Sequence, residues 1–143
     1  MFSKACEYGI KATVYIHNQS QKGNRVNLKS VAKAIDSPVA FTAKILQSLT
    51  HNDIITSTKG ATGGYEVLSH HSKTNLLELV KAIDGDKIYN GCALGFEHCS
   101  SDKPCPIHAE FKSVREDLKE MLLSTTIEGL ARDLSKGKAF LKE

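Results

Sequence analysis

Two short helical patterns joined by a very short turn constrain the fold of this chain more than any other feature. Apolar residues recur at helical spacing over residues 27–34 and again from residue 37 to about 50, with Asp36 at the centre of the turn. Ser37 and Pro38 are expected to open the second helix as a side-chain N-cap followed by proline. The second helix also has a small polar and basic face, and such a pair predicts a helix-turn-helix.

A glycine-rich loop between two short β-branched or apolar runs follows this pair. Residues 54–58 and 65–68 flank the loop 59–64, and the pattern predicts a hairpin because glycine supplies the positive φ that such turns require. A hairpin directly after a helix-turn-helix is a wing, and Lys59 at its tip is expected to enter a minor groove or touch phosphate. A nucleotide-binding loop is excluded because its GKS/T ending and following helix are missing.

The remaining apolar patterns predict further helices. Each shows a stripe at three- and four-residue intervals, and two carry the polar pair of a capping box. The expected helices cover residues 5–19, residues 75–84 with Gly85 as the stop, a longest helix from Pro106 to about Leu123, and a short last helix capped by Thr125 with Glu128.

The helix expected to begin at Pro106 has a narrow apolar seam. Its apolar residues alternate at intervals of four and three, averaging 3.5, and its opposite side is highly charged. Two heptads are too few for a secure free-standing coiled coil, so a helix packed on its own domain is the alternative. The narrow seam and the DNA-binding pattern favour a homodimer. The expected dimer contacts are Ile107, Phe111, Val114, Leu118 and Met121.

Three of the four cysteines gather in one loop and are followed by a histidine. Thiolates suit zinc, copper(I) and iron–sulfur clusters, but the spacing contains no C-x2-C knuckle, so a zinc finger or ribbon fits poorly. Glycine, serine and proline make the segment a loop able to wrap a polynuclear centre, which needs four protein ligands. Zinc, and thiols that are redox-active or inert, remain alternatives. The candidate ligands are Cys92, Cys99, Cys105 and His108.

Charge divides the chain into two unlike halves. Residues 1–75 carry nine Lys and Arg against four Asp and Glu, whereas residues 76–143 carry ten against twelve. A basic first half suggests a polyanion as partner, with ordinary solvated surface as the alternative. No apolar run of membrane-spanning length and no export signal is visible, so a cytoplasmic protein without a membrane partner is expected. There, clustered cysteines more often mean metal or redox chemistry than disulfides.

Taken together, these features resemble the Rrf family of winged helix-turn-helix transcriptional regulators, the group of IscR, NsrR and RirA. The resemblance covers nearly the whole chain. It is carried by Phe41, Lys44-Ile45-Leu46 and Leu49 in the third helix, Ser57-x-Lys59-Gly60-x-x-Gly63-Gly64-Tyr65 in the wing, Leu76-Leu77-x-Leu79-Val80-x-Ala82-Ile83-x-Gly85, and the triple cysteine followed by Pro106-x-His108.

The resemblance implies a homodimer that binds a palindromic operator in double-stranded DNA and senses iron, redox state or nitric oxide. It also implies a 2Fe-2S or 4Fe-4S cluster, easily lost in aerobic handling, on Cys92, Cys99 and Cys105. The fourth ligand differs among relatives and would be His108 or Glu7 of the partner subunit. In the chain itself, Glu7 is by default a first-turn acid that favours the helix dipole. Cys6 is expected in the core, and His98 is expected to be an ordinary loop histidine.

Some positions depart from the family pattern. Phe41 stands in place of the usual tyrosine, Thr42 in place of leucine, and Ala43 where some relatives have a glutamate, so operator preference is not transferable. Lys59 replaces an arginine, which keeps the charge but loses the bidentate fork. Expected phosphate or groove contacts are Lys29, Lys44 and Lys59, expected base-edge contacts are Thr42 and Gln47, and Ser37, Phe41 and Thr62 complete the expected DNA-binding set.

The sequence therefore predicts a mainly α chain with a small β-hairpin wing and no enzymatic activity, since no nucleophile–base pair or cofactor fingerprint is present. A winged helix-turn-helix domain is expected over residues 1–85, a cysteine-rich cluster-binding loop over 86–105, and a dimerisation helix with a C-terminal helix over 106–143. The expected function is a cluster-sensing repressor. The alternatives are a thiol-redox or zinc-binding regulator of the same fold, and a cluster or redox protein that does not bind DNA.

Overall fold

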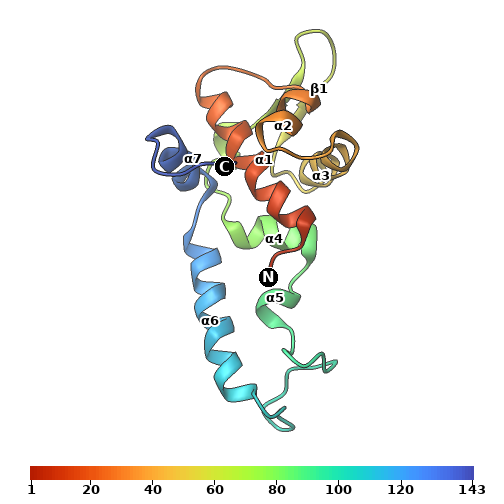
Figure 1. Ribbon diagram of the computed structural model, residues 1–143, viewed down its shortest axis with the longest axis vertical. Coiled ribbons are helices and arrows are strands. Elements are labelled where there is room, and N and C mark those ends of the chain that lie inside the picture. The colour runs from red at the N-terminus through yellow and green to blue at the C-terminus, as the bar shows by residue number, and fades with distance from the viewer.

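The computed structural model describes residues 1–143. The molecule is elongated: a helical lobe with the wing forms one end, and the cysteine loop forms the other end (Figure 1). The predicted mainly α fold with a two-stranded wing is confirmed. In chain order the elements are α1 (Lys4–Gln21), α2 (Leu28–Ala34), α3 (Val39–His51), β1 (Thr56–Thr58), β2 (Gly64–Glu66), the 3-10 turn η1 (Ser69–His71), α4 (Leu76–Asp84), α5 (Lys87–Asn90), α6 (His108–Ser124) and α7 (Ile127–Ser135).

Helix α1 runs through the lobe and organises its core. Ser3 caps the helix by accepting a hydrogen bond from the backbone N–H of Cys6, and the Cys6 side chain is buried, as the sequence predicts. Leu46 and Leu49 of α3 and Leu79 of α4 are fully buried in the same cluster. Burying side chains of this size typically stabilises a fold by roughly 1.5–3 kcal/mol each, so this lobe holds most of the folding energy.

The turn between α2 and α3 differs from its prediction in one detail. Asp36 takes a positive φ of 53° there, which turns the chain sharply. Helix α3 begins at Val39, with Pro38 rather than Ser37 at the N-cap position and no side-chain cap. The Ser37 hydroxyl instead hydrogen-bonds the Thr42 hydroxyl. The prediction that Ser37 caps the helix is therefore wrong, because its hydroxyl is engaged by a side chain one turn later.

The wing depends on two adjacent glycines. Strands β1 and β2 are antiparallel, with Ser57 opposite Tyr65. A Cβ at Gly63 would lie 2.1 Å from the carbonyl oxygen of Thr58. Gly64 has a φ of 139°, and a Cβ there would lie 2.8 Å from the carbonyl oxygen of Val26. Only glycine permits this close approach, so the wing is held to the segment before α2 as well as to itself.

A buried histidine fixes the chain after the wing. The Nδ1 atom of His71 accepts a hydrogen bond from the backbone N–H of Leu68 at 3.0 Å, which leaves the proton on Nε2. Nε2 lies 2.9 Å from Oδ1 of Asp53, just after α3. Asp53, His70 and His71 have potential metal-ligating atoms within 4.8 Å of one another. Because both His71 nitrogens are already engaged, we interpret the group as a structural clamp rather than a metal site.

The last two helices begin later than predicted. Helix α6 begins at His108 rather than Pro106, after a turn in which the His108 N–H bonds the Cys105 carbonyl. It has 17 residues, so α1, with 18, is the longest helix. The cap of α7 is Thr126 rather than Thr125, since the Thr126 hydroxyl accepts from the N–H of Gly129.

Helix α7 folds back onto the lobe instead of extending the dimerisation segment. The Ser135 hydroxyl donates to Oδ1 of Asn18 in α1 at 2.8 Å. Just before α7, Thr126 forms a backbone bridge with Asn75 at the start of α4. The chain thus leaves the lobe at α5 and returns to it at α7. None of the helices combines the length and apolar character of a membrane span.

Candidate functional site

Helix α3 presents a polar row to solvent beside the wing. Lys44 and Gln47 are exposed and lie three residues apart, and His51 follows after four more. Helical periodicity places all three on one face. Sequence reasoning found Lys44 and Gln47 and missed His51, although the same spacing would have found it. This face has the position and chemistry of a recognition helix.

Of the residues expected to contact DNA from α3, Thr42 belongs to the interior instead and Phe41 is half-buried. The Thr42 side chain is fully buried, and its hydroxyl donates to the Pro38 carbonyl at 2.7 Å. The Phe41 ring packs edge-to-face against Tyr8, with 5.7 Å between ring centroids. The prediction that Thr42 reads a base edge is therefore wrong, because its only polar atom is satisfied inside the helix. Phe41 likewise braces α3 against α1.

A shallow hollow lies between α3 and the wing. It joins the polar row of α3 to β1 and β2, so helix α3 and the wing face the same side of the lobe. Lys59 and Thr62 of the wing are exposed, as is Lys29 of α2. Because these side chains are free, they remain candidates for phosphate contacts. The hollow is lined by Ala43, Gln47, Thr50, His51, Ser57 and Tyr65.

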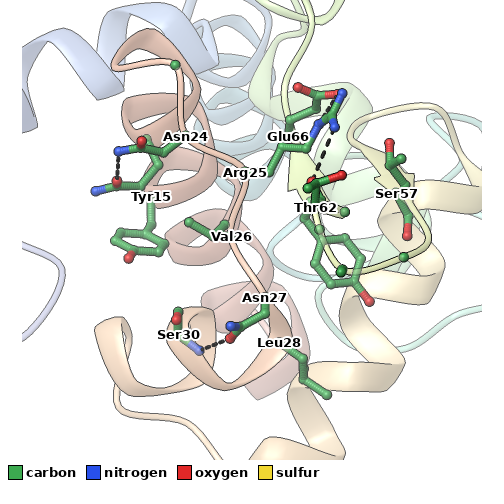
Figure 2. Close-up of a pocket in the computed structure, with 18 residues that line it drawn as sticks. Tyr15, Asn24, Arg25, Val26, Asn27, Leu28, Ser30, Ser57, Thr62 and Glu66 are labelled. Carbon is green, nitrogen blue, oxygen red and sulfur yellow. Dashed lines mark hydrogen bonds and ion pairs between the residues drawn. The ribbon is translucent and has the colours of Figure 1, made fainter.

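An open cleft of about 990 Å³ lies on the other side of the wing, where the segment before α2 faces the loop between the strands (Figure 2). Arg25 crosses it: Nε lies 3.1 Å from Glu66 of β2, and the guanidinium donates to the Thr62 carbonyl at 3.3 Å. Sequence reasoning missed Arg25, which precedes α2 outside any periodic pattern. Since its partners both belong to the wing, Arg25 fixes the orientation of the wing relative to the helix-turn-helix.

The Cys92 thiol lies in a tight turn at the start of the cysteine loop. The pKa of Cys92 is lowered, first by a hydrogen bond from the Phe96 N–H and further by the Leu94 N–H, the Cys105 thiol and the Gly95 N–H, while burial opposes the shift. Converging N–H groups of this kind stabilise a thiolate. The turn closes through a Gly95 N–H bond to the Cys92 carbonyl. Cys92 is therefore prepared to act as a metal ligand or nucleophile.

The remaining candidate ligands form a second pair. Sγ of Cys99 lies 3.3 Å from Nδ1 of His108, the first residue of α6. Nε2 of His108 lies 3.4 Å from the Ser101 hydroxyl. The four donors therefore lie as two pairs, Cys92 with Cys105 and Cys99 with His108, and no three of their ligand atoms lie within 4.8 Å of one another. All the cysteines are free thiols.

Three other residues considered as ligands lie in unlike settings. Burial raises the pKa of the Cys6 thiol to about 12, so Cys6 stays protonated in the core. Glu7 pairs with Lys4 of its own helix at 3.0 Å, as a first-turn acid. His98 is exposed in the loop. Within one chain, His108 is the candidate fourth ligand that contacts a loop cysteine.

The apolar seam of α6 is divided between two sides. Leu118 is half-buried and packs against the core of the lobe, Phe111 is half-buried beside Arg115, and Leu122 is fully buried. Val114 and Met121 are exposed, at 56% and 43% of their surface, and Ile107 is 40% exposed at the start of the helix. The helix therefore has one flank packed on its own chain and an adjacent apolar flank open to solvent.

The sequence pattern of the Rrf2 family, described as an iron-dependent transcriptional regulator, matches residues 2–133. The chain belongs to the Rrf2 family. A relative described as an HTH-type transcriptional regulator of Aquifex aeolicus is 24% identical over 132 residues, covering 91% of this chain and 90% of its own.

Solved structures similar to this Rrf2 chain share its fold. CymR of B. subtilis, described as its global cysteine regulator, has a TM-score of 0.75 at 21% identity and covers 92% of this chain and 96% of its own. IscR of T. potens has a TM-score of 0.73 at 17% identity, with 97% and 91% covered. The Rrf2 chain is accordingly a transcriptional regulator and not an enzyme, which confirms both expectations.

Proposed function

We propose that this protein is a cytoplasmic, homodimeric repressor that binds a palindromic operator and responds to iron, redox state or nitric oxide through an iron–sulfur cluster in its cysteine loop. The observation that carries the sensing part is the arrangement of the loop donors in two pairs. Cys92 and Cys105 form one pair, and Cys99 and His108 form the other.

Recognition of DNA falls to the α3 face and the wing. In the proposed complex, α3 enters the major groove, where Gln47 and His51 reach base edges. Lys44 and Lys29 contact phosphates, and Lys59 reaches the backbone or minor groove from the wing. All five side chains are exposed on the lobe. The Arg25 contacts with β2 and the wing loop keep these two reading elements in one orientation.

Dimerisation falls to the open flank of α6. Ile107, Val114 and Met121 recur at seven-residue intervals and are exposed, so a second copy would cover them as in a short coiled coil. A two-fold axis along this flank would present two lobes to one face of the DNA. Half-sites would then lie about one helical turn apart.

The donor set of the loop fits an iron–sulfur cluster. Soft thiolates predominate, the N–H groups around Cys92 favour the deprotonated sulfur, and two pairs suit the two irons of a 2Fe-2S centre. Cys92, Cys99, Cys105 and His108 would hold it, and when bound it would supply reversible one-electron chemistry and a reaction site for nitric oxide. His108 is preferred over Glu7 of the partner subunit because it already contacts Cys99.

A regulator without a cluster is the second candidate, favoured by the contact of Cys92 with Cys105. With a peroxide as oxidant, two thiols can give one disulfide, two protons and two electrons, which reduce the peroxide to water or an alcohol and water. The low pKa of Cys92 would favour this attack. CymR of Staphylococcus aureus has a structure in an oxidised form, although that describes only the relative.

Anaerobic purification with iron and sulfide analysis tests the proposal. We expect visible absorption and iron and sulfide in equal amounts, both abolished by Cys92→Ala and by Cys99→Ala. His108→Ala should shift the spectrum, whereas Glu7→Ala should leave it unchanged. Stoichiometric zinc without sulfide would contradict the cluster, and a Cys92–Cys105 disulfide formed by peroxide in a metal-free protein would establish the second candidate.

A further inference from the structure

Arg115 is a buried charged side chain whose role the proposed function does not use. Only 9% of its surface is exposed, and it lies in the middle of α6 among solvent-facing charged neighbours. Its guanidinium donates one hydrogen bond, to the Gly91 carbonyl, while its Nε has no partner. It forms no ion pair with any carboxylate. A buried cation with one neutral acceptor is unfavourable, so such a residue is expected to serve a purpose other than packing.

The position of Arg115 joins the two ends of the cysteine loop. Gly91 ends α5 and directly precedes Cys92, and its N–H closes α5 by bonding the Lys87 carbonyl. The guanidinium carbon of Arg115 also lies 5.8 Å from the ring centroid of Phe111, one turn nearer His108. One side chain therefore contacts the backbone where the loop begins and the helix turn into which the loop leads.

A second contact also joins α6 to α5, but it does not involve the cysteine loop. One turn beyond Arg115, Nζ of Lys119 lies 5.9 Å from the ring centroid of Tyr89, which is buried in α5. Lys119 is exposed, however, and makes no contact with the loop itself. The contact from α6 to the backbone beside Cys92 is thus made by Arg115.

We propose that Arg115 is the positioning residue through which the state of the cysteine loop acts on α6. Gly91 directly precedes Cys92, so a rearrangement of the loop at Cys92 would move the carbonyl that accepts from the guanidinium. Because the guanidinium also lies on the Phe111 ring, losing this contact would alter the packing of the first turns of α6. This proposal rests on the loop-sensing function, but its structural part is independent of any bound group.

Hydrogen exchange of the full-length, metal-free protein tests the structural part. Arg115→Met keeps an apolar stem of similar length and removes the guanidinium, whereas Lys112→Met removes an exposed charge from the same helix, whose only ion pair is with Glu116 at 4.0 Å. We expect Arg115→Met to speed amide exchange in residues 88–95 and in the first two turns of α6 by about tenfold, with the lobe unchanged. Equal exchange in both variants would overturn the proposal.

Arg115→Lys provides the second variant and keeps the test decisive if the methionine form fails to fold. Lysine retains the charge but lacks the planar guanidinium fork, which can donate to a carbonyl while its face lies on an aromatic ring. We expect exchange in residues 88–95 to rise in this variant too, by less than in Arg115→Met. Exchange at the wild-type rate in Arg115→Lys would overturn the role assigned to the fork.

The effect of the loop on DNA binding is tested by the ratio of two operator affinities, that of the cluster-bound protein and that of the metal-free protein. We expect the wild-type ratio to fall to within about twofold of unity in Arg115→Met, with one of the two affinities and the dimer preserved. The wild-type ratio retained in this variant would overturn the proposal. A wild type with equal affinities would instead refute the sensing function, while the exchange experiment would still decide whether Arg115 holds the loop.

Discussion

The lobe and the arm, which we define as residues 92–124, differ in how many of their side chains are buried. In the lobe, helices from distant parts of the sequence enclose fully buried residues such as Leu46, Leu79 and Ile16. In the arm, only Cys105, Arg115 and Leu122 are buried. The difference teaches that, in a chain of 143 residues, the side chains that stabilise the fold are concentrated in the lobe, and the arm that carries three of the cysteines contributes few of them.

The surfaces of the two regions differ as well. The DNA-facing side of the lobe is polar, whereas the arm exposes large apolar side chains, among them Leu94 and Phe96 in the loop and Val114 in α6. Exposed apolar groups that gather in one region indicate a surface that binds a partner molecule. For α6 we propose a second copy of the chain. In this proposal the lobe faces DNA and the arm faces a second copy of the chain.

The largest effect should come from truncating the core of the lobe. Leu46→Ala should lower the free energy of unfolding by roughly 2–5 kcal/mol, because it leaves a cavity in a fully buried site. Leu94→Ala, in the exposed loop, should change it by less than about 0.5 kcal/mol. Urea denaturation of the metal-free protein measures both. A Leu94→Ala loss equal to that of Leu46→Ala would remove the distinction between lobe and arm.

Charges on the open flank of α6 should separate the dimer. Val114→Glu combined with Met121→Lys should weaken self-association on the order of 100-fold, since both side chains are exposed in the single chain and would be buried by the partner. Phe111 and Leu118 are less suitable because both are half-buried within their own chain. Sedimentation equilibrium gives the dissociation constant, and Glu116→Lys on the opposite, exposed face is the control. An unaffected dimer would assign the interface to another surface.

A smaller effect is expected at the wing. Lys59→Ala should lower affinity about three- to tenfold on every DNA sequence and reduce the salt dependence by about one released counterion. Gln47→Ala should instead change the preference among sequences. Fluorescence anisotropy at several salt concentrations measures both. If the two variants behaved alike, the division of the lobe into a positioning wing and a reading helix would be wrong.

The smallest effect should come from the clamp after the wing. The pKa of Asp53 is lowered from 3.8, first by its hydrogen bond with His71. A lowered folded-state pKa stabilises the fold above the ordinary pKa, and this stability is lost as pH falls through the lowered value. Asp53→Asn should therefore reduce the melting temperature slightly at pH 7, and this difference should shrink as the pH falls below 3.8. The effect is small because the carboxylate is largely exposed; a difference that stays constant as the pH falls below 3.8 would contradict it.

Local patterns were sufficient to predict the lobe. The stripes of α1 and α4 and the glycine pair of the wing depend on neighbours within a few residues, so periodicity and φ preferences locate them. The cysteine loop was found for the same reason, since its composition alone excludes regular structure. The sequence misplaced the ends of elements: Ser37, Pro106 and Thr125 are each reasonable caps, but competing hydrogen bonds with residues close to them in the chain decided against them.

The burial of two polar side chains was missed for different reasons. Thr42 lies at helical spacing from the buried Ile45 and Leu49, so spacing places it inside, but its polar side chain was interpreted as a solvent-facing group. Its hydroxyl is satisfied by the Pro38 carbonyl, which allows it to lie there. Arg115 belongs to a charged stretch and becomes buried because α5 passes beside α6. The four-residue α5 has no periodicity to detect, so the burial of Arg115 depends on chain segments that meet only in the folded state.

The backbone bridge between Asn75 and Thr126 closes the arm at its base. Everything between α5 and this bridge is an excursion whose two ends are fastened to the same lobe. Such an excursion can gain or lose residues at its tip without altering the register of the elements that hold it. Under the proposed function, the spacing of the cysteines, and with it the signal detected, can therefore change without altering the elements that recognise DNA.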